Sequence, residues 1–306
     1  MGVRITQRLL VDRVLSNLNR QSREILDLQT QLSTGQRVNK PSDDPLATRR
    51  AVNARTEVGK NEQFLGNITA VSPQLRDSEL AVLSSIDLIQ RANELTLQGN
   101  NGTNTQPQRE AIANEIDEII EEMLSLGNRS SNGRYVFGGT RTLDEPMVAT
   151  RNLAGDITAV AYAGNSDEIP VEIGESLTVA ANQPGDSVYF SSSAQTVDIY
   201  QTLIDTRDAL RTGNAAGINT GLAELKTARE QLGVVLSRIG AIQNRLERTG
   251  GNLEDINLQL TEVVSDNIDA DFAEVTLNLN AQTNAFQAAL NAGARVIQPS
   301  LLDFVR

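Results

Sequence analysis

The sequence predicts a mostly α-helical protein with a long helical rod, terminal coiled-coil helices and a small β-rich insert. Three observations support this fold class. Apolar residues recur every seven positions near both ends of the chain, and a third series of the same spacing precedes the C-terminal one. Between the ends, the pattern changes to short runs of β-branched residues bounded by Gly, Asn, Asp, Ser and Pro. Heptad repeats make the narrow stripe that coiled coils bury, whereas bounded β-branched runs are typical of strands.

The two ends of the chain carry apolar stripes that predict helices built to pair with each other. The first stripe is Val11, Leu18, Ile25 and Leu32, with Val14 and Leu28 in the companion position. The second lies between Ile268 and Val296 and is formed by Ile268, Phe272, Val275, Leu279 and Phe286. Residues 1–50 carry nine Lys or Arg and five Asp or Glu, whereas residues 251–306 carry two and eight. These opposite net charges favour docking of the two ends.

Both terminal stripes are too narrow to form a globular core, so they predict association with other subunits. The residues expected at inter-subunit coiled-coil contacts are Val11, Leu18, Ile25, Leu28, Ile268, Phe272, Leu279 and Phe286. The alternative is that some of them face only the partner helix within one subunit. The sequence leaves both possibilities open.

Composition excludes several classes of function. The 306 residues include no Cys, no His and no Trp, and the aromatic content is 3%. Thiol nucleophiles, thiolate metal ligands and the commonest general base are therefore absent, so we expect no enzyme, no cofactor and no metal. A net charge of −12 and a pI of about 4.6 argue against a nucleic-acid partner.

Hydropathy gives no indication of a membrane partner. The sequence has no apolar run of about 18 residues that could span a bilayer. The N-terminus also lacks the apolar run and small-residue cleavage site of a Sec-type signal peptide. Export by a route that reads an unfolded N-terminus remains compatible with the sequence.

Helix boundaries in the first half of the chain are marked by Gly and Pro. They predict a stop after Thr34 at Gly35, a start at Asp44-Pro45, a kink or fresh start at Ser72-Pro73, a break at residues 99–102, and a start at Gln106-Pro107. Asp43 and Asp44 could be read as a metal site or an acid/base pair, but their place before Pro45 favours helix capping. The carboxylates of Glu115, Asp117, Glu118, Glu121 and Glu122 are interpreted as a solvated helix face rather than a cation site.

The central segment predicts short strands. They are expected at residues 134–139, 157–162, 169–173, 177–179 and 188–190. Helices resume at Val197, and the longest element is predicted from the seven-residue spacing of Ile218, Leu225, Leu232, Ile239, Leu246, Leu253 and Leu260. This register continues through Gly250-Gly251, so we expect the helix to continue there. At about 1.5 Å per residue, it would approach about 65 Å in length.

The spacing between apolar residues shortens from seven to four positions through Leu260, Val264, Ile268 and Phe272, and the heptads then resume. A four-residue stutter locally unwinds a coiled coil, so we interpret it as the boundary between the rod and the terminal segment. Asp266, Asp269 and Asp271 lie there with a faint likeness to a calcium loop. No glycine turn and no Glu at the twelfth position follow, so a metal site is not favoured.

Two short motifs near the ends of the chain carry a resemblance to a known family. Residues 32–45 read Leu-Ser-Thr-Gly-Gln-Arg-Val-Asn-Lys-Pro-Ser-Asp-Asp-Pro. They are similar to the first signature of the flagellin family, in the form found at the junction between hook and filament. Residues 269–274 resemble the start of the C-terminal signature, and residues 300–304 resemble the closing residues of the junction type. The resemblance covers about the first 140 and the last 110 residues and leaves the β-rich insert unmatched.

The resemblance implies a structural subunit of the bacterial flagellum, secreted through the flagellar type III channel and located extracellularly at the hook-filament junction. It implies self-association in a ring or helical assembly. The expected partners are another hook-associated protein, flagellin, and an export chaperone at the C-terminal segment. Filament flagellin is the nearest alternative, and an exported helical adhesin or secretion-system rod protein is the alternative of a different class.

This resemblance also divides the chain into three regions. A terminal helical assembly segment is expected at residues 1–44 and 265–306, and a helical rod domain at residues 45–140 and 194–264. The small β-rich outer domain is expected at residues 141–193.

Overall fold

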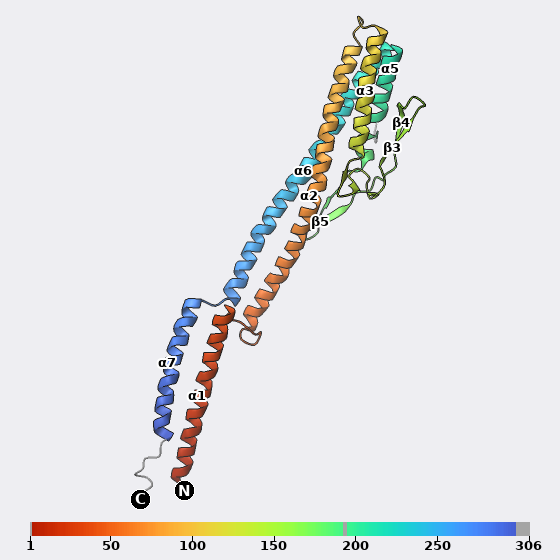
Figure 1. Ribbon diagram of the computed structural model, residues 1–306. Coiled ribbons are helices and arrows are strands. Elements are labelled where there is room, and N and C mark those ends of the chain that lie inside the picture. Colours follow the sequence, from red (N-terminus) through yellow and green to blue (C-terminus); the bar gives the residue numbers. More distant parts are fainter. Residues whose placement is uncertain (1, 192–194, 298–306) are drawn as a thin grey trace. The chain divides into compact units, whose positions relative to one another are not determined.

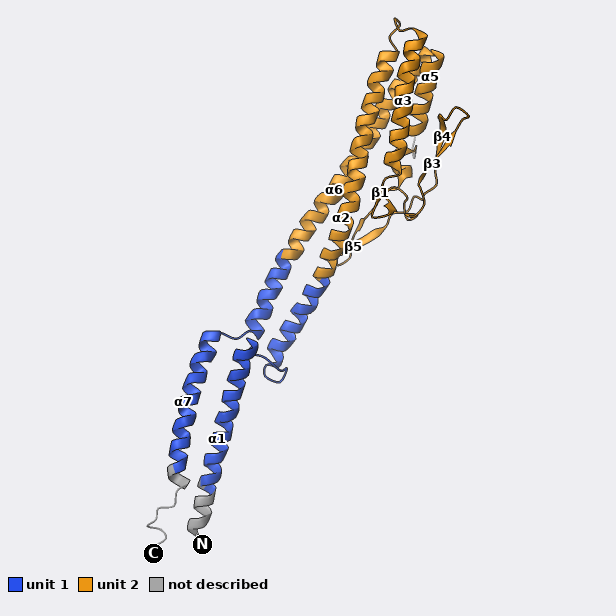
Figure 2. Ribbon diagram, viewed as in Figure 1, with its two compact units in different colours: residues 1–60, 255–306 blue, residues 61–254 orange. Residues whose placement is uncertain are grey.

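The computed structural model describes residues 2–191 and 195–297, and its chain divides into two compact units (Figure 2). Unit 1 comprises residues 1–60 and 255–306, and unit 2 comprises residues 61–254. The signature-like residues 300–304 lie outside the described residues.

Long helices make up most of the described chain, so the predicted mostly α-helical class is confirmed (Figure 1). They are α1 (Gly2–Thr34), α2 (Pro45–Gly99), α3 (Gln106–Gly127), α4 (Gly185–Tyr189), α5 (Ile199–Thr212), α6 (Ala215–Ile268) and α7 (Phe272–Ile297). At 55 residues, α2 is one residue longer than α6, so the prediction that the later helix is the longest element is wrong.

Several helix boundaries fall where the sequence predicts them. Gly35 follows α1 with a φ of 71°, in the left-handed region that favours glycine. At the start of α2, an Asp44 carboxylate oxygen accepts a hydrogen bond from the Ala47 amide at 3.0 Å. This bond and the nearby Arg37 guanidinium lower the pKa of the Asp44 carboxyl. Asp44 is therefore a capping residue of α2.

A kink or a fresh helix start is predicted at Ser72-Pro73, and the fresh start is wrong, because α2 continues through Pro73. Proline has no amide hydrogen to donate and is unfavourable inside a helix. Two neighbours, Val71 and Leu75, are nevertheless buried in the core on either side of it. Tertiary packing of this apolar face outweighs the local preference for a helix start.

The core of unit 2 forms where α2 and α6 run antiparallel. The direction follows from two side-chain hydrogen bonds, one joining Asn100 to Asn219 and the other joining Gln243 to Glu79. The heptad residues of α6 from Ile218 to Leu253 are buried in this core, and α6 continues through Gly250-Gly251 as predicted. In Figure 1, α3 and α5 lie beside these helices at one end of the unit.

Three two-stranded antiparallel sheets form the β-rich part of unit 2. The strands are β1 (Ser130–Ser131), β2 (Arg134–Tyr135), β3 (Met147–Arg151), β4 (Ile157–Tyr162), β5 (Pro170–Gly174) and β6 (Leu177–Ala180). Each sheet pairs consecutive strands, with β-bulges or register shifts at Thr150/Arg151 and Glu172/Gly174. The predicted strands at 157–162, 169–173 and 177–179 are matched within one residue.

Two strand predictions for this region are wrong, and two observed strands, β1 and β3, were not predicted. Residues 188–190 were expected as a strand, but Val188 and Tyr189 belong to the short helix α4. Both side chains are buried, which helical spacing permits and strand alternation does not. Of the strand predicted at 134–139, only β2 forms, and β3 was not predicted.

The C-terminal helix begins four residues later than the predicted stripe. Ile268 ends α6, and α7 starts at Phe272 because an Asp271 carboxylate oxygen accepts hydrogen bonds from the amides of Ala273 and Glu274, at 2.8 and 3.2 Å. Ile268 is therefore not on the helix that carries Phe272, Leu279 and Phe286.

Candidate assembly surface

In unit 1, α1 and α7 lie side by side and antiparallel (Figure 1). The Gln282 amide donates a hydrogen bond to the Glu24 carboxylate. Further along the pair, a Cβ added to Gly293 would meet a Val14 methyl group at 3.0 Å. Gly293 on α7 thus lets the two helices approach closely at this point.

The predicted contact residues occupy three different environments. Val11, Leu18, Ile25, Leu28, Leu279 and Phe286 lie on α1 and α7 and are half-buried. Ile268 is buried in a separate small core with Val38, Ala47 and Ala51. Phe272, at the first position of α7, has a relative exposure of 66%, whereas Val275 is the buried residue of that turn.

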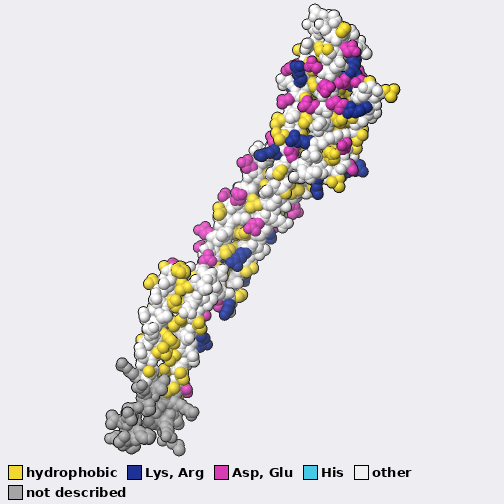
Figure 3. All heavy atoms as spheres, viewed as in Figure 1, with side chains coloured by type: hydrophobic (Ala, Val, Ile, Leu, Met, Phe, Trp, Pro, Cys, Tyr) yellow, Lys and Arg dark blue, Asp and Glu magenta, His cyan; other side chains and the backbone are white. Residues whose placement is uncertain are grey.

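Unit 1 also exposes large apolar side chains that the heptad analysis did not single out. On α1 and α7, besides Phe272, they are Leu9, Leu15, Leu26, Leu277 and Leu290. Figure 3 shows hydrophobic side chains gathered over α7 and α1, where few charged side chains lie. Across its described length, α7 contains Glu274 and Arg295 as its only charged residues. Exposed apolar patches of this kind are typical of protein interaction sites.

The exposed leucines of α7 can be recognised by their positions relative to its buried stripe. On α7 the buried and half-buried positions alternate by four and three residues, through Val275, Leu279, Gln282, Phe286, Ala289 and Gly293. Leu277 and Leu290 fall outside that series. Leu277 lies on the far side of the helix from the buried stripe, and Leu290 lies at the flank of the stripe, four residues after Phe286. A helix with apolar residues outside its buried stripe has surface left for another chain.

The described residues offer no metal-binding cluster. Within them, no group of three or more Asp, Glu, His or Cys side chains is arranged to hold a metal ion. Of the three aspartates at the α6–α7 junction, Asp269 accepts a hydrogen bond from the Ser265 hydroxyl and Asp271 caps α7. No helix in the described part of the chain is long and apolar enough to cross a bilayer.

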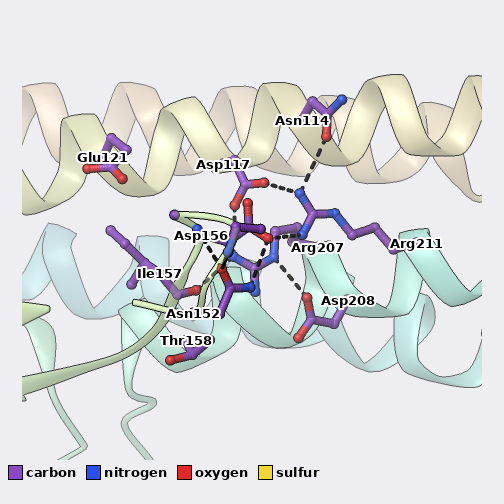
Figure 4. Close-up of polar contacts among 12 residues, drawn as sticks. Asn114, Asp117, Glu121, Asn152, Asp156, Ile157, Thr158, Arg207, Asp208 and Arg211 are labelled. Atoms are coloured by element: carbon purple, nitrogen blue, oxygen red, sulfur yellow. Dashed lines mark hydrogen bonds and ion pairs between the residues drawn. The ribbon is translucent and has the colours of Figure 1, made fainter. Parts of the chain in front are cut away.

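The acidic face of α3 is largely occupied by ion pairs rather than free for cations. Glu115 pairs with Arg91, and Glu121 pairs with Arg151. Asp117 pairs with both Arg207 and Arg211 (Figure 4). The hydrogen bond from Arg151 lowers the pKa of Glu121. These contacts hold the β3–β4 hairpin and α5 against α3.

Together these features define a class: a helical structural protein with paired terminal helices around a small β-containing insert. The sequence profile of the bacterial flagellin N-terminal helical region matches residues 7–142, and that of the C-terminal helical region matches residues 222–305. The chain belongs to the flagellin family.

Two curated relatives align with most of the chain. Flagellar hook-associated protein 3 of Escherichia coli K12 is 24% identical over 311 residues, covering 95% of this chain and 96% of the relative. Flagellin of Bacillus subtilis 168 is 29% identical over 270 residues, covering 85% and 86%.

A solved structure shares the fold. The flagellar junction protein FlgL from Legionella pneumophila superposes with a TM-score of 0.59 at 18% identity, covering 73% of this chain and all of that one.

Proposed function

We propose that the chain is a structural, non-enzymatic subunit of the bacterial flagellum that forms the junction between hook and filament. The observation that carries this proposal is the nearly end-to-end correspondence with hook-associated protein 3, which extends through the small β-containing insert. The Pro-Ser-Asp-Asp-Pro sequence at residues 41–45 supports it, because this form of the signature resembles the junction type.

Assembly is driven by the terminal helices. Ordering a residue costs about 1–2 kcal/mol of backbone entropy, so a thin helix pair gains little stability within one subunit. Neighbouring subunits supply the missing apolar contacts to Leu9, Leu15, Leu26, Leu277 and Leu290, together with Phe272 and the other stripe residues. Folding of the ends is thereby coupled to incorporation, and assembly is cooperative.

The proposal includes the location and the partners. The subunit is secreted and acts outside the cell, between another hook-associated protein and flagellin. Before export, a chaperone covers the C-terminal segment, which contains the apolar residues of α7. Without such a cover, this surface would favour premature association.

Filament flagellin is the second candidate, because the B. subtilis flagellin is 29% identical over most of both chains. A strain lacking this gene separates the two functions. For a junction subunit, we expect hooks without filaments and unassembled flagellin in the medium. Loss of filament protein itself, or filaments formed by the purified chain alone on salting out, would instead identify a flagellin.

The apolar surface of α7 makes a specific prediction. Phe272→Asp and Leu277→Asp are expected to reduce incorporation at the hook about tenfold or more, because full burial of such a side chain contributes about 1.5–3 kcal/mol. Both side chains are exposed, at 66% and 70%, so the urea midpoint of the monomer should not change. Incorporation is measured by pelleting hooks with labelled protein.

The control is Leu143→Asp, in the β-rich part of unit 2, where the side chain is 79% exposed. This variant should be incorporated like the wild type. Equal incorporation of all three variants would show that the α7 surface does not face another subunit.

A further inference from the structure

The two linkers that join the terminal helices to the rest of unit 1 are hydrogen-bonded to each other. Gln36 and Asp269 form an antiparallel β-bridge. The Arg37 and Val38 amides donate to the Ile268 carbonyl at 2.7 and 3.3 Å, and the Ala270 amide donates to the Gly35 carbonyl at 2.9 Å. We call residues 35–38 and 267–270 the linker clasp.

Arg37 closes the linker clasp from its solvent side. Its guanidinium donates to the Asn267 carbonyl at 2.7 Å and lies 3.5 Å from the Asp44 carboxylate. Asn267 is in the last turn of α6, where carbonyl groups lack helical partners and carry partial negative charge. One side chain thus connects the C-terminal end of α6 to the capping residue of α2.

The linker clasp is anchored on the α2/α6 side. Val38 and Ile268 each have a relative exposure of 5% and pack with Ala47 and Ala51 of α2, with Val264 beside them. By contrast, the described apolar residues of α1 that face α7 are only half-buried. A segment with buried side chains and internal hydrogen bonds opens less readily than a thin helix pair.

The linker clasp also sets the register of the terminal helices. Glu24 lies ten residues before Thr34, the last residue of α1, and Gln282 lies ten residues after Phe272, the first of α7. These two residues are hydrogen-bonded partners. Equal lengths of helix therefore run from the clasp to each partner, so the clasp aligns the α1 and α7 stripes.

We propose that the linker clasp is a preformed register device that stays closed in the free monomer while α1 and α7 order on assembly. The boundary of the assembly segment then falls at Gly35 and Asp271, rather than at residues 44 and 265. The ordering step rests on the proposed function, whereas the clasp and the role of Arg37 as its positioning residue do not. Fixing the end of α1 and the start of α7 at one point removes most of the search for the correct alignment of the two helices.

Residue-resolved hydrogen exchange on the full-length monomer tests the proposal. The amides of Arg37, Val38 and Ala270 should be protected to the same degree as those of residues 50–58 in α2. Those of residues 12–30 and 275–290 should exchange at least tenfold faster. Clasp amides that exchange as fast as the terminal helices would overturn the proposal.

Variants at Arg37 separate positioning from general stability. Arg37→Ala should raise exchange at Val38 and Ala270 about tenfold and leave residues 50–58 unchanged, and Arg37→Lys should restore part of the protection. Arg20→Ala is the matched control, because the Arg20 guanidinium donates to Asn17 within α1. Unchanged clasp exchange in Arg37→Ala would refute the role of Arg37.

The incorporation assay at the hook is independent of these measurements. If the clasp amides are protected but the protein is never incorporated at the hook, the clasp proposal is supported and the proposed function is rejected. If the clasp amides are unprotected but the protein is incorporated normally, the clasp proposal is rejected and the proposed function is supported.

Discussion

Replacing Arg207 by alanine is expected to destabilise unit 2 by about 3 kcal/mol, because it removes a buried side chain, leaves the Ile157 carbonyl without its donor and takes one of two arginines from Asp117. The Arg207 side chain has a relative exposure of 2%. Its guanidinium donates to Asp117 at 2.7 Å, to Asp208 at 2.8 Å and to the Ile157 carbonyl at 2.8 Å (Figure 4). Burial alone would lower the pKa of Arg207, but the hydrogen bonds to Asp208 and Asp117 outweigh it and raise the pKa.

The loss of stability in Arg207→Ala should be concentrated at the β3–β4 hairpin. The Ile157 carbonyl is the first of β4 and loses its hydrogen bond from Arg207. Arg211 still pairs with Asp117 and Asp156, and hydrogen bonds from Asn152 and Arg211 lower the pKa of Asp156. The hairpin therefore keeps the Arg211–Asp156 and Arg151–Glu121 ion pairs but loses its contact with the buried Arg207, and it should open locally before unit 2 unfolds.

Urea unfolding and hydrogen exchange of β3 and β4 measure both effects. The matched control is Arg238→Ala, which removes a solvent-exposed ion pair with Glu168 and should change stability by less than about 1 kcal/mol. If both variants lose the same small amount, the Arg207 contacts do not hold the hairpin.

The helices were predictable because their signals are repeated and local. Seven-residue spacing from Ile218 to Leu260, and capping residues such as Asp44, each specify helix without knowledge of distant contacts. Pro73 shows the limit of local rules, since the burial of Val71 and Leu75 decides that α2 continues. The helix α4 was missed for a similar reason, because Tyr189 is placed by the core rather than by its neighbours in sequence.

The candidate surface was predictable only in outline. Heptad spacing located the paired ends, but it did not show that Phe272 is exposed at the start of a capped helix. It also could not reveal the linker clasp, which joins residues more than two hundred positions apart through backbone atoms. Arg207 likewise looks like any surface arginine on a helix until α3 and β4 close over it.

Buried tyrosines give the chain a second large effect, a steep loss of stability in alkaline solution. Tyr189 and Tyr200 are fully buried, with ring centroids 5.7 Å apart, and contact Phe137 and Phe190. The Tyr189 hydroxyl lies 3.2 Å from the Ser85 hydroxyl, and the Tyr200 hydroxyl donates to the Met123 carbonyl at 3.1 Å. Burial raises the pKa of the Tyr189 and Tyr200 phenols well above that of a free tyrosine. It raises the pKa of the half-buried Tyr162 to about 12.

The sign follows from comparing the two states. A tyrosine in the unfolded chain loses its proton near pH 10, whereas the buried phenols keep theirs, so their contribution to stability is complete below pH 10. Above that pH, the unfolded state releases protons that the folded state retains. Stability should fall by about 1.4 kcal/mol per pH unit for each buried tyrosine, or about 3 kcal/mol per unit for Tyr189 and Tyr200 together.

Urea unfolding between pH 9 and pH 11.5 measures this slope, and the double variant Tyr189→Phe, Tyr200→Phe isolates its cause. The variant keeps both rings in the core, and the Ser85 hydroxyl still donates to the Ala81 carbonyl, so stability at pH 8 should fall by only about 1–3 kcal/mol for the two hydroxyls. Its alkaline slope should be shallower by about 3 kcal/mol per pH unit, because the groups whose titration opposes folding are gone. Lysine titration and net-charge repulsion are common to both proteins and cancel in the comparison. The same slope in both proteins would mean that the two phenols have the same pKa in the folded and unfolded states. Water would then have to reach this aromatic core.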